Sequence, residues 1–208
     1  MKWRYVLLAA VLVVQIPLLH QACWSAPPAS QSLPFADDFE RAELGPAYGT
    51  FFHAARPKIE AGRLWTGEVK NNPIWLDLEL PEDVVVTFDV QATARAGDVK
   101  WELFGNGRDH ESGYVFVFGG WTNTISIIAR LDEHGSDRKE RKDFRVDPAR
   151  VYQMRVERKA GHLKWYVDGT LFLEWKDESP LTGTGHDRFG FSAWETPAYF
   201  DNLRIEAL

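Results

Sequence analysis

One acidic residue lies inside a largely apolar stretch of the sequence, where it could serve as a catalytic carboxylate. Glu102 lies inside the apolar run Val99-Lys100-Trp101-Glu102-Leu103-Phe104, and on a strand it would face away from Trp101. Glycoside cleavage ordinarily needs two carboxylates, about 5–5.5 Å apart in retaining enzymes, with one raised in pKa as the acid. Glu102 stands alone in its run. It is therefore a candidate catalytic residue, and the alternative is an ordinary sheet-face glutamate that pairs with a Lys or Arg.

Signatures of other chemistries are absent from the sequence. It contains no Gly-x-Ser-x-Gly, no His-Glu-x-x-His and no glycine-rich phosphate loop, and its only cysteine is Cys23. None of the six histidines is spaced like a zinc ligand. The stretch Asp132-Glu133-His134-Gly135-Ser136-Asp137 breaks the ligand order of an EF-hand. The sequence thus offers neither a nucleophile nor a zinc site.

Two tryptophans have positions that favour ligand binding. Trp121 follows Gly119-Gly120, where strand periodicity breaks, and Trp194 ends a strand just before Glu195-Thr196-Pro197. A tryptophan at a loop end can stack its flat apolar face on a sugar ring, while polar neighbours bind the hydroxyls. The alternative is that each ring covers an open end of the fold. The remaining tryptophans are expected to be mostly core, and four of them share parity with aliphatic neighbours: Trp65, Trp101, Trp165 and Trp175.

Polar residues on predicted strands complete the candidate site. Arg130, Glu102 and Arg155 should project from sheet surfaces, because their neighbours along the strand are predicted to point inward. For Arg130 these inward neighbours are Ala129 and Leu131. The alternation of side chains along a strand does not show whether the strands of Arg130, Glu102 and Arg155 belong to one sheet. Asn123 lies with Trp121 in the turn of a predicted hairpin, and His134 lies near the other end. We therefore expect Trp121 and His134 not to share a site, and the loop after Asp132 to be solvated.

Period-two alternation runs through the chain from Phe35 onward. Val84, Val86, Phe88 and Val90 form one face of a run whose other face is Thr87, Asp89 and Gln91. Turn residues separate such runs at Ala61-Gly62, at Ala160-Gly161 and at Asp168-Gly169, the last being a strong two-residue hairpin signal. Eleven or twelve short strands at this spacing predict an all-β protein, either a two-sheet sandwich or a barrel.

Six short motifs occur in a characteristic order. They are Asp37-Asp38-Phe39, Gly62-x-Leu64, Tyr152-x-x-Arg155-x-Glu157-x-x-x-Gly161, Tyr166-Val167-Asp168-Gly169, Phe189-Gly190-Phe191 and Phe200-Asp201-Asn202-Leu203-Arg204-Ile205. This order resembles the concanavalin A-like lectin/glucanase superfamily, and most of all its laminin-G-like and 3-keto-disaccharide-hydrolase-like bacterial domains. The resemblance spans nearly all of residues 34–208 and implies a two-sheet antiparallel jelly roll. It leaves activity open, because the superfamily holds lectins, hydrolases, lyases and adhesion modules.

The resemblance also bears on catalysis and on metal binding. Family-16 glucanases of this fold carry Glu-x-Asp-x-x-Glu on one strand, and that spacing is absent here. Carbohydrate-active jelly rolls often bind a structural calcium through the aspartate that opens the last strand. Asp201 is the matching position, with Asp38 as a neighbouring ligand, and calcium favours such oxygen ligands. The alternative is that Asp201 caps a turn or pairs with a cation.

The N-terminal segment predicts export. Lys2 and Arg4 precede an apolar stretch, so residues 1–22 are typical of a signal peptide. The stretch before Cys23 resembles a loose lipobox, which would make Cys23 a lipidated first residue; ordinary cleavage after Ser25 is the alternative. Residues 23–33 are a Pro/Ser-rich spacer, expected to be flexible. Residues 34–208 are predicted to be a single domain without disulfides.

Charge narrows the range of partners. The chain carries a net formal charge of −6, and loss of the leader would leave 22 basic against 30 acidic residues. An acidic surface repels phosphate backbones, so nucleic acid is excluded as a partner. We expect a monomeric module of the cell envelope that binds a polysaccharide or oligosaccharide, in the periplasm, on the outer membrane or outside the cell. The alternatives are an enzyme acting on keto-sugar glycosides and a structural or adhesion module that binds protein.

Overall fold

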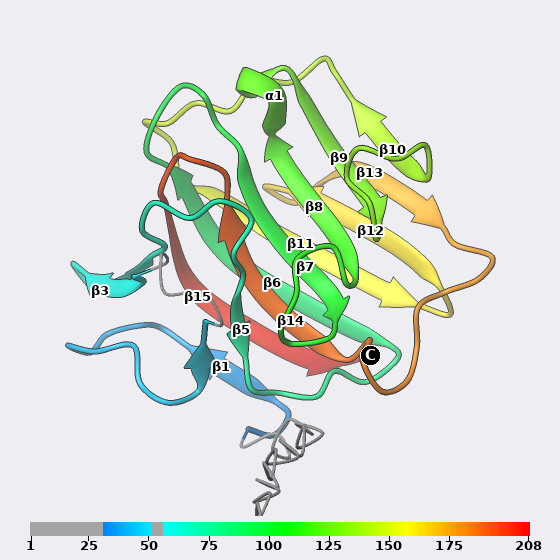
Figure 1. Cartoon of the computed structure of the whole chain (residues 1–208), viewed down its shortest axis with the longest axis horizontal. Coiled ribbons are helices and arrows are strands. Elements are labelled where there is room, and N and C mark those ends of the chain that lie inside the picture. The colour runs from blue at the N-terminus through cyan, green and yellow to red at the C-terminus, as the bar shows by residue number, and fades with distance from the viewer. Residues whose placement is uncertain (1–30, 51–55) are drawn as a thin grey trace, which may run out of the picture.

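The fold is a sandwich of two antiparallel β-sheets (Figure 1), seen in a computed structural model that describes residues 31–50 and 56–208. The first sheet has eight strands. Seven follow the order β13 (Thr170–Lys176), β12 (His162–Val167), β11 (Tyr152–Lys159), β6 (Val84–Ala92), β15 (Ala198–Ala207), β4 (Arg63–Trp65) and β3 (Lys58–Glu60), while β1 (Phe35–Asp37) also pairs with β15. The prediction of an all-β jelly roll is confirmed.

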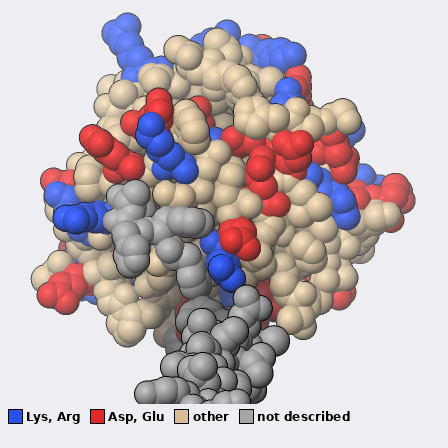
Figure 2. Space-filling view, in the orientation of Figure 1, with Lys and Arg blue, Asp and Glu red and all other residues tan. Residues whose placement is uncertain are grey.

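The second sheet has seven strands and carries the site described below. Its order is β10 (Arg138–Arg141), β9 (Ile125–Arg130), β8 (Tyr114–Gly119), β7 (Val99–Gly105), β14 (Arg188–Ala193), β5 (Ile74–Leu76) and β2 (Tyr48–Gly49). A four-residue turn, α1 (Gly120–Asn123), joins β8 to β9. Charged side chains of both signs are interspersed on the face of the molecule that Figure 2 shows.

Local turn chemistry sets the register of the hairpins. The central residues of the turns at Ala61-Gly62, Ala160-Gly161 and Asp168-Gly169 all have positive φ. Each turn closes a two-residue connection, since Val167 pairs with Thr170 and the other two turns have equivalent pairs. Such connections match the right-handed twist of the flanking strands.

Aromatic side chains fill the space between the sheets. The Trp101 and Trp165 rings, from opposite sheets, meet edge to face with centroids 5.0 Å apart, and Phe88 lies 5.1 Å from Trp101. Trp175 is also buried, as predicted. Trp65 is only half-buried, beneath Lys58, because its neighbour Leu64 takes the inward position on β4. Edge-to-face pairs of this kind add to the stabilisation that burial alone provides.

The strands β8 and β9 are buried on both faces. The inward face carries residues such as Phe116 and Ile128, whereas the outward face carries a second apolar cluster: Val115, Val117, Ile125, Ile127 and Ala129. Strand parity therefore does not identify the inward side here, because apolar residues occupy both.

The N-terminal predictions fall largely outside the described residues. These are the leader at 1–22, lipidation of Cys23 and most of the spacer. The last part of the spacer is ordered, since the Gln31 N–H donates to the Asp77 carbonyl at 3.1 Å and Leu33 packs against the core. Within residues 31–50 and 56–208, no helix has the length and apolar character needed to cross a membrane.

Candidate functional site

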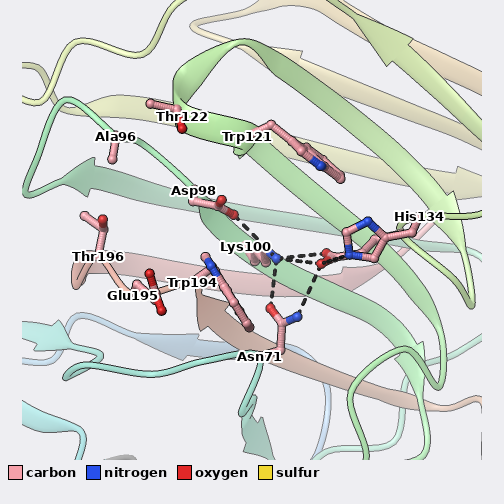
Figure 3. A pocket seen from close by; sticks show the side chains of 11 residues that line it. Asn71, Ala96, Asp98, Lys100, Trp121, Thr122, His134, Trp194, Glu195 and Thr196 are labelled. Carbon is pink, nitrogen blue, oxygen red and sulfur yellow. Dashed lines mark hydrogen bonds and ion pairs between the residues drawn. The ribbon is translucent and has the colours of Figure 1, made fainter.

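A pocket of about 320 Å³ opens on the outer face of the seven-stranded sheet (Figure 3). Five separate chain segments supply its walls, and all of them except β7 are turns or loops. The lining residues are Asn71, Ala96, Asp98, Lys100, Trp121, Thr122, Glu133, His134, Trp194, Glu195 and Thr196.

Lys100 forms the floor of the pocket. It lies on β7 and alternates with inward-facing Val99 and Trp101, so its side chain points to the outer face. Although it is charged, it is only 3% exposed. Its Nζ donates to Asn71 Oδ1 at 2.8 Å and lies 2.9 Å from each carboxylate oxygen of Glu133. An ammonium has three N–H donors, so these contacts use all of them.

Asp98 borders the same floor with fewer partners. Its Oδ1 lies 3.4 Å from Lys100 Nζ and, among the described residues, has no hydrogen-bond partner. Burial raises the pKa of Asp98, and the nearby Glu133 carboxylate raises it further, while Lys100 opposes the rise.

Two tryptophans stand on either side of Lys100 (Figure 3). Trp121 is 37% exposed and Trp194 is 40% exposed. Lys100 Nζ lies 5.5 Å from the centre of the Trp194 ring, and the Arg138 guanidinium lies 5.4 Å from that of Trp121. The Trp194 backbone N–H donates to the Asp98 carbonyl at 3.1 Å, which ties one wall to the start of β7.

The other wall depends on a left-handed turn. Trp121, Thr122 and Asn123 all have φ between 50 and 62°, a region that is unfavourable for these side chains and most of all for a β-branched threonine. The Asn123 side chain holds the turn in place. Its amide donates to the carbonyls of Arg95 and Val146 at 3.0 and 2.8 Å, and its Oδ1 accepts from the Val146 N–H at 2.8 Å. Asn123 is therefore a positioning residue for Trp121.

Beside the pocket, on the same outer face of the sheet, lies a second cluster of polar residues. Glu102 is fully buried and does not line the pocket; its Oε1 lies 2.6 Å from His110 Nδ1, and burial raises its pKa. Ligand atoms of His110, Glu111 and Glu133 lie within 4.8 Å of one another, which is close enough for a metal ion. Both Glu133 oxygens already contact Lys100, however, and that ammonium would repel a cation placed there.

The structure changes several sequence-based expectations. The expectation that Trp121 and His134 do not share a site is wrong: their ring centres are 5.4 Å apart and both line the pocket. The loop after Asp132 is not simply solvated, because it delivers Glu133, which is 3% exposed, to Lys100. Asn123 was predicted to contact a ligand. Its side chain instead makes the hydrogen bonds that hold the turn.

The predicted arginines lie elsewhere. Arg130 points toward the inner side of the sandwich, in register with Tyr114, and its Nε lies 3.3 Å from Asp177 Oδ2. Ala129, its expected inward neighbour, lies in the outer apolar cluster. Arg155 belongs to β11 of the other sheet and pairs with Glu157. Arg130, Glu102 and Arg155 therefore do not form one binding face.

The two residues predicted to bind calcium, Asp38 and Asp201, lie near one end of the β1–β15 pair. Asp37 pairs with Leu203, which brings the following Asp38 toward the beginning of β15. Asp201 Oδ1 accepts from the Asn202 N–H at 2.7 Å, and burial raises the pKa of Asp201, with Asp89 adding to the rise. A calcium ion at Asp201 and Asp38 stays a prediction.

The central residues of the pocket were not identified from sequence. Lys100 had one usable signal, because it shares the outward parity of Glu102 in an apolar strand. Asp98, Glu133 and Asn71 had none, since each lies in a loop whose path only the folded chain defines.

Known proteins resemble this chain in fold. No family model matches it, and no curated protein matches its sequence. A carbohydrate-binding module, CBM66 from Bacillus subtilis, superposes with a TM-score of 0.63 at 16% identity, covering 85% of this chain and 99% of that one. A β-glucanase from Bacillus licheniformis superposes with a TM-score of 0.61 at 12% identity, covering 84% and 98%. A structure from a study of gut-microbiota endo-acting O-glycanases gives a TM-score of 0.60 at 15% identity, covering 84% and 98%. The class of fold is thus the jelly-roll β-sandwich, as the sequence motifs indicated.

Proposed function

We propose that this protein is a saccharide-binding module and that the pocket between Trp121 and Trp194 holds the sugar. The observation that carries the proposal is the pairing of two half-exposed indole rings with a floor of fixed polar groups. Rings of this kind supply flat apolar surface for the C–H face of a pyranose, and Lys100, Asn71 and Asp98 supply groups of the kind that bind hydroxyls. The fold neighbours named above include a carbohydrate-binding module and a β-glucanase, which supports the same class of ligand.

The test compares tryptophan variants by glycan array and then by calorimetry. If a sugar covers about 50 Å² of each ring, at roughly 25 cal/mol per Å² each stack contributes about 1.3 kcal/mol, close to a tenfold change in Kd. We expect Trp121→Ala and Trp194→Ala each to weaken binding by about that factor. Both rings are partly exposed, so thermal stability should change little.

A matched control comes from the other sheet. Leu171 is 42% exposed on β13, and Leu171→Ala should leave affinity and melting temperature as in the parent. If the parent binds no glycan, or if both tryptophan variants bind as the parent does, the pocket is not a sugar site. If both variants unfold at clearly lower temperature, the rings serve as covers for the fold.

A glycoside-active enzyme is the second candidate. Two carboxylates, those of Asp98 and Glu133, approach Lys100 within the same pocket, and glycosidases of most families work with two carboxyl groups. Any glycan bound in the first experiment should be incubated with the protein and the products analysed. Product formed by the parent and lost in Asp98→Asn would favour the enzyme over the binder.

We propose further that the protein is exported and attached to the cell envelope by lipid at Cys23. The leader-like residues 1–22 and the lipobox-like sequence before Cys23 support this. Full-length protein should partition into membranes, and Cys23→Ser should release it or stall its processing. A mature protein that begins at Ala26 by mass spectrometry would refute the lipid anchor.

A further inference from the structure

The pocket between the two tryptophans has walls on all sides. In Figure 3, Trp121 and Trp194 lie on two opposite sides of Lys100, and Thr196 and His134 lie on the other two. Five wall segments surround the floor in this way. In chain order they are residues 70–71, 95–98, 121–123, 133–134 and 193–196.

Main-chain hydrogen bonds join three of the wall segments. The Asn71 N–H donates to the Ala193 carbonyl at 3.2 Å, which joins the first segment to the fifth. The Trp194 N–H donates to the Asp98 carbonyl at 3.1 Å, which joins the fifth segment to the second. These two bonds close the side of the pocket on which Trp194 stands.

Side chains complete the ring of wall segments. The Asn123 amide, described above, holds the third segment to the second. The ring centres of Trp121 and His134 lie 5.4 Å apart, edge to face, which joins the third segment to the fourth. The Asn71 amide donates to Glu133 Oε1 at 3.2 Å and joins the fourth segment to the first. Each wall segment therefore contacts both of its neighbours in the ring.

The closed wall limits how a glycan can occupy the pocket. A chain that ran through the pocket would need an entrance and an exit between wall segments, whereas a chain end can enter from the solvent side alone. The volume of about 320 Å³ is at the lower end of the range of roughly 300–1,000 Å³ that small-molecule sites span. The pocket therefore has space for one sugar ring and little more.

We propose that the pocket binds the terminal residue of a glycan end-on, with the rest of the chain projecting into solvent. An internal residue carries a glycosidic bond on each side, and the wall would collide with at least one of the two neighbouring sugars. This assignment rests on the proposed saccharide-binding function and narrows its ligand from any segment of a glycan to a chain end.

The test multiplies chain ends without changing the sugar. The probe is the polymer whose sugar and linkage the glycan array selects; soluble amylose, laminarin, xylan and β-mannan cover common neutral linkages. Calorimetry compares the intact polymer with fragments made from it by partial acid hydrolysis. The protein bound per gram of glycan should rise by the same factor as the number of chain ends. Oligomers of increasing length should share one Kd to within about twofold, because the added residues make no contact.

The wall itself supplies a variant and a matched control. The His134 side chain is 68% exposed, so its removal should cost little stability. His134→Ala removes the ring that meets Trp121 and lowers the wall there. Internal residues should then gain access, and the intact polymer should bind more protein per gram than it does with the parent. His162→Ala removes an exposed histidine from β12 of the other sheet and should behave as the parent.

The outcomes separate this inference from the proposed function. If polymer and fragments bind the same amount of protein per gram, or if Kd falls steadily with oligomer length, the end-on assignment is overturned while saccharide binding stands. If the parent binds no glycan, both fail. Parental behaviour of His134→Ala would overturn the role of the closed wall.

Discussion

Replacing Asn123 by glycine tests whether this side chain holds the Trp121 turn. The substitution removes three hydrogen bonds, all to main-chain groups of Arg95 and Val146. At about 1 kcal/mol for each bond, the loss is about 3 kcal/mol. A domain of this size loses roughly 2–4 °C in melting temperature per kcal/mol, so Asn123→Gly should melt about 6–12 °C below the parent.

A second variant separates hydrogen bonding from backbone strain. Asn123 has φ of 62°, which glycine adopts without strain and alanine does not. Asn123→Ala should therefore be less stable than Asn123→Gly by about 1–2 kcal/mol, the cost of a left-handed residue that carries a Cβ. Melting curves followed by circular dichroism measure both differences.

Sugar affinity completes the test. Because the turn aims Trp121 into the pocket, both variants should bind glycan more weakly at a temperature where they remain folded. The reasoning is refuted if Asn123→Gly melts within about 2 °C of the parent, or if the alanine variant equals or exceeds the glycine variant in stability. Unchanged affinity in folded variants would show that Trp121 does not need Asn123.

Two further predictions concern the buried carboxyl group of Glu102 and the predicted calcium site. Burial raises the pKa of Glu102, so the contribution of Glu102 to stability is present at low pH and is lost as the pH rises through the raised pKa. The melting temperature of Glu102→Gln should therefore gain on that of the parent between pH 4 and 7. A difference in melting temperature that does not vary with pH would contradict this. If calcium binds at Asp201 and Asp38, chelation should lower the melting temperature, since a ligand at one hundred times its Kd stabilises the fold by about 2.7 kcal/mol. Asp201→Asn should abolish the response, and identical melting curves with and without chelator would exclude the site.

The sequence alone was sufficient to predict the fold class. Alternation in Val84–Ala92 and the turns at Ala61-Gly62 and Asp168-Gly169 are local features, and the structure confirms the strand and both hairpins. Local features survive folding because the pleat fixes which face each side chain takes and because positive φ favours particular residues. The exposed tryptophans were also found this way, since each interrupts a periodic pattern.

Parity failed where both faces of a strand are covered. Arg130 was assigned to the solvent side because Ala129 was read as inward, yet Ala129 belongs to the outer apolar cluster. An alternating pattern marks the inward side only when the outer face is polar. On β9 the outer face is the apolar one, with Ile125, Ile127 and Ala129, whereas the inner face carries Ser126 and Arg130 beside Ile128.

Only the tertiary structure decided the composition of the site. The pocket joins Asn71, Asp98 and Lys100, Trp121, Glu133 and Trp194, from segments spread over more than half of the chain. Sequence does not show which of these segments meet, because the strand order β9-β8-β7-β14-β5 places segments that are distant in the chain side by side. The partners of a buried charge are likewise set by three-dimensional distance, so only the fold reveals that Glu133 and Asn71 occupy every donor of Lys100.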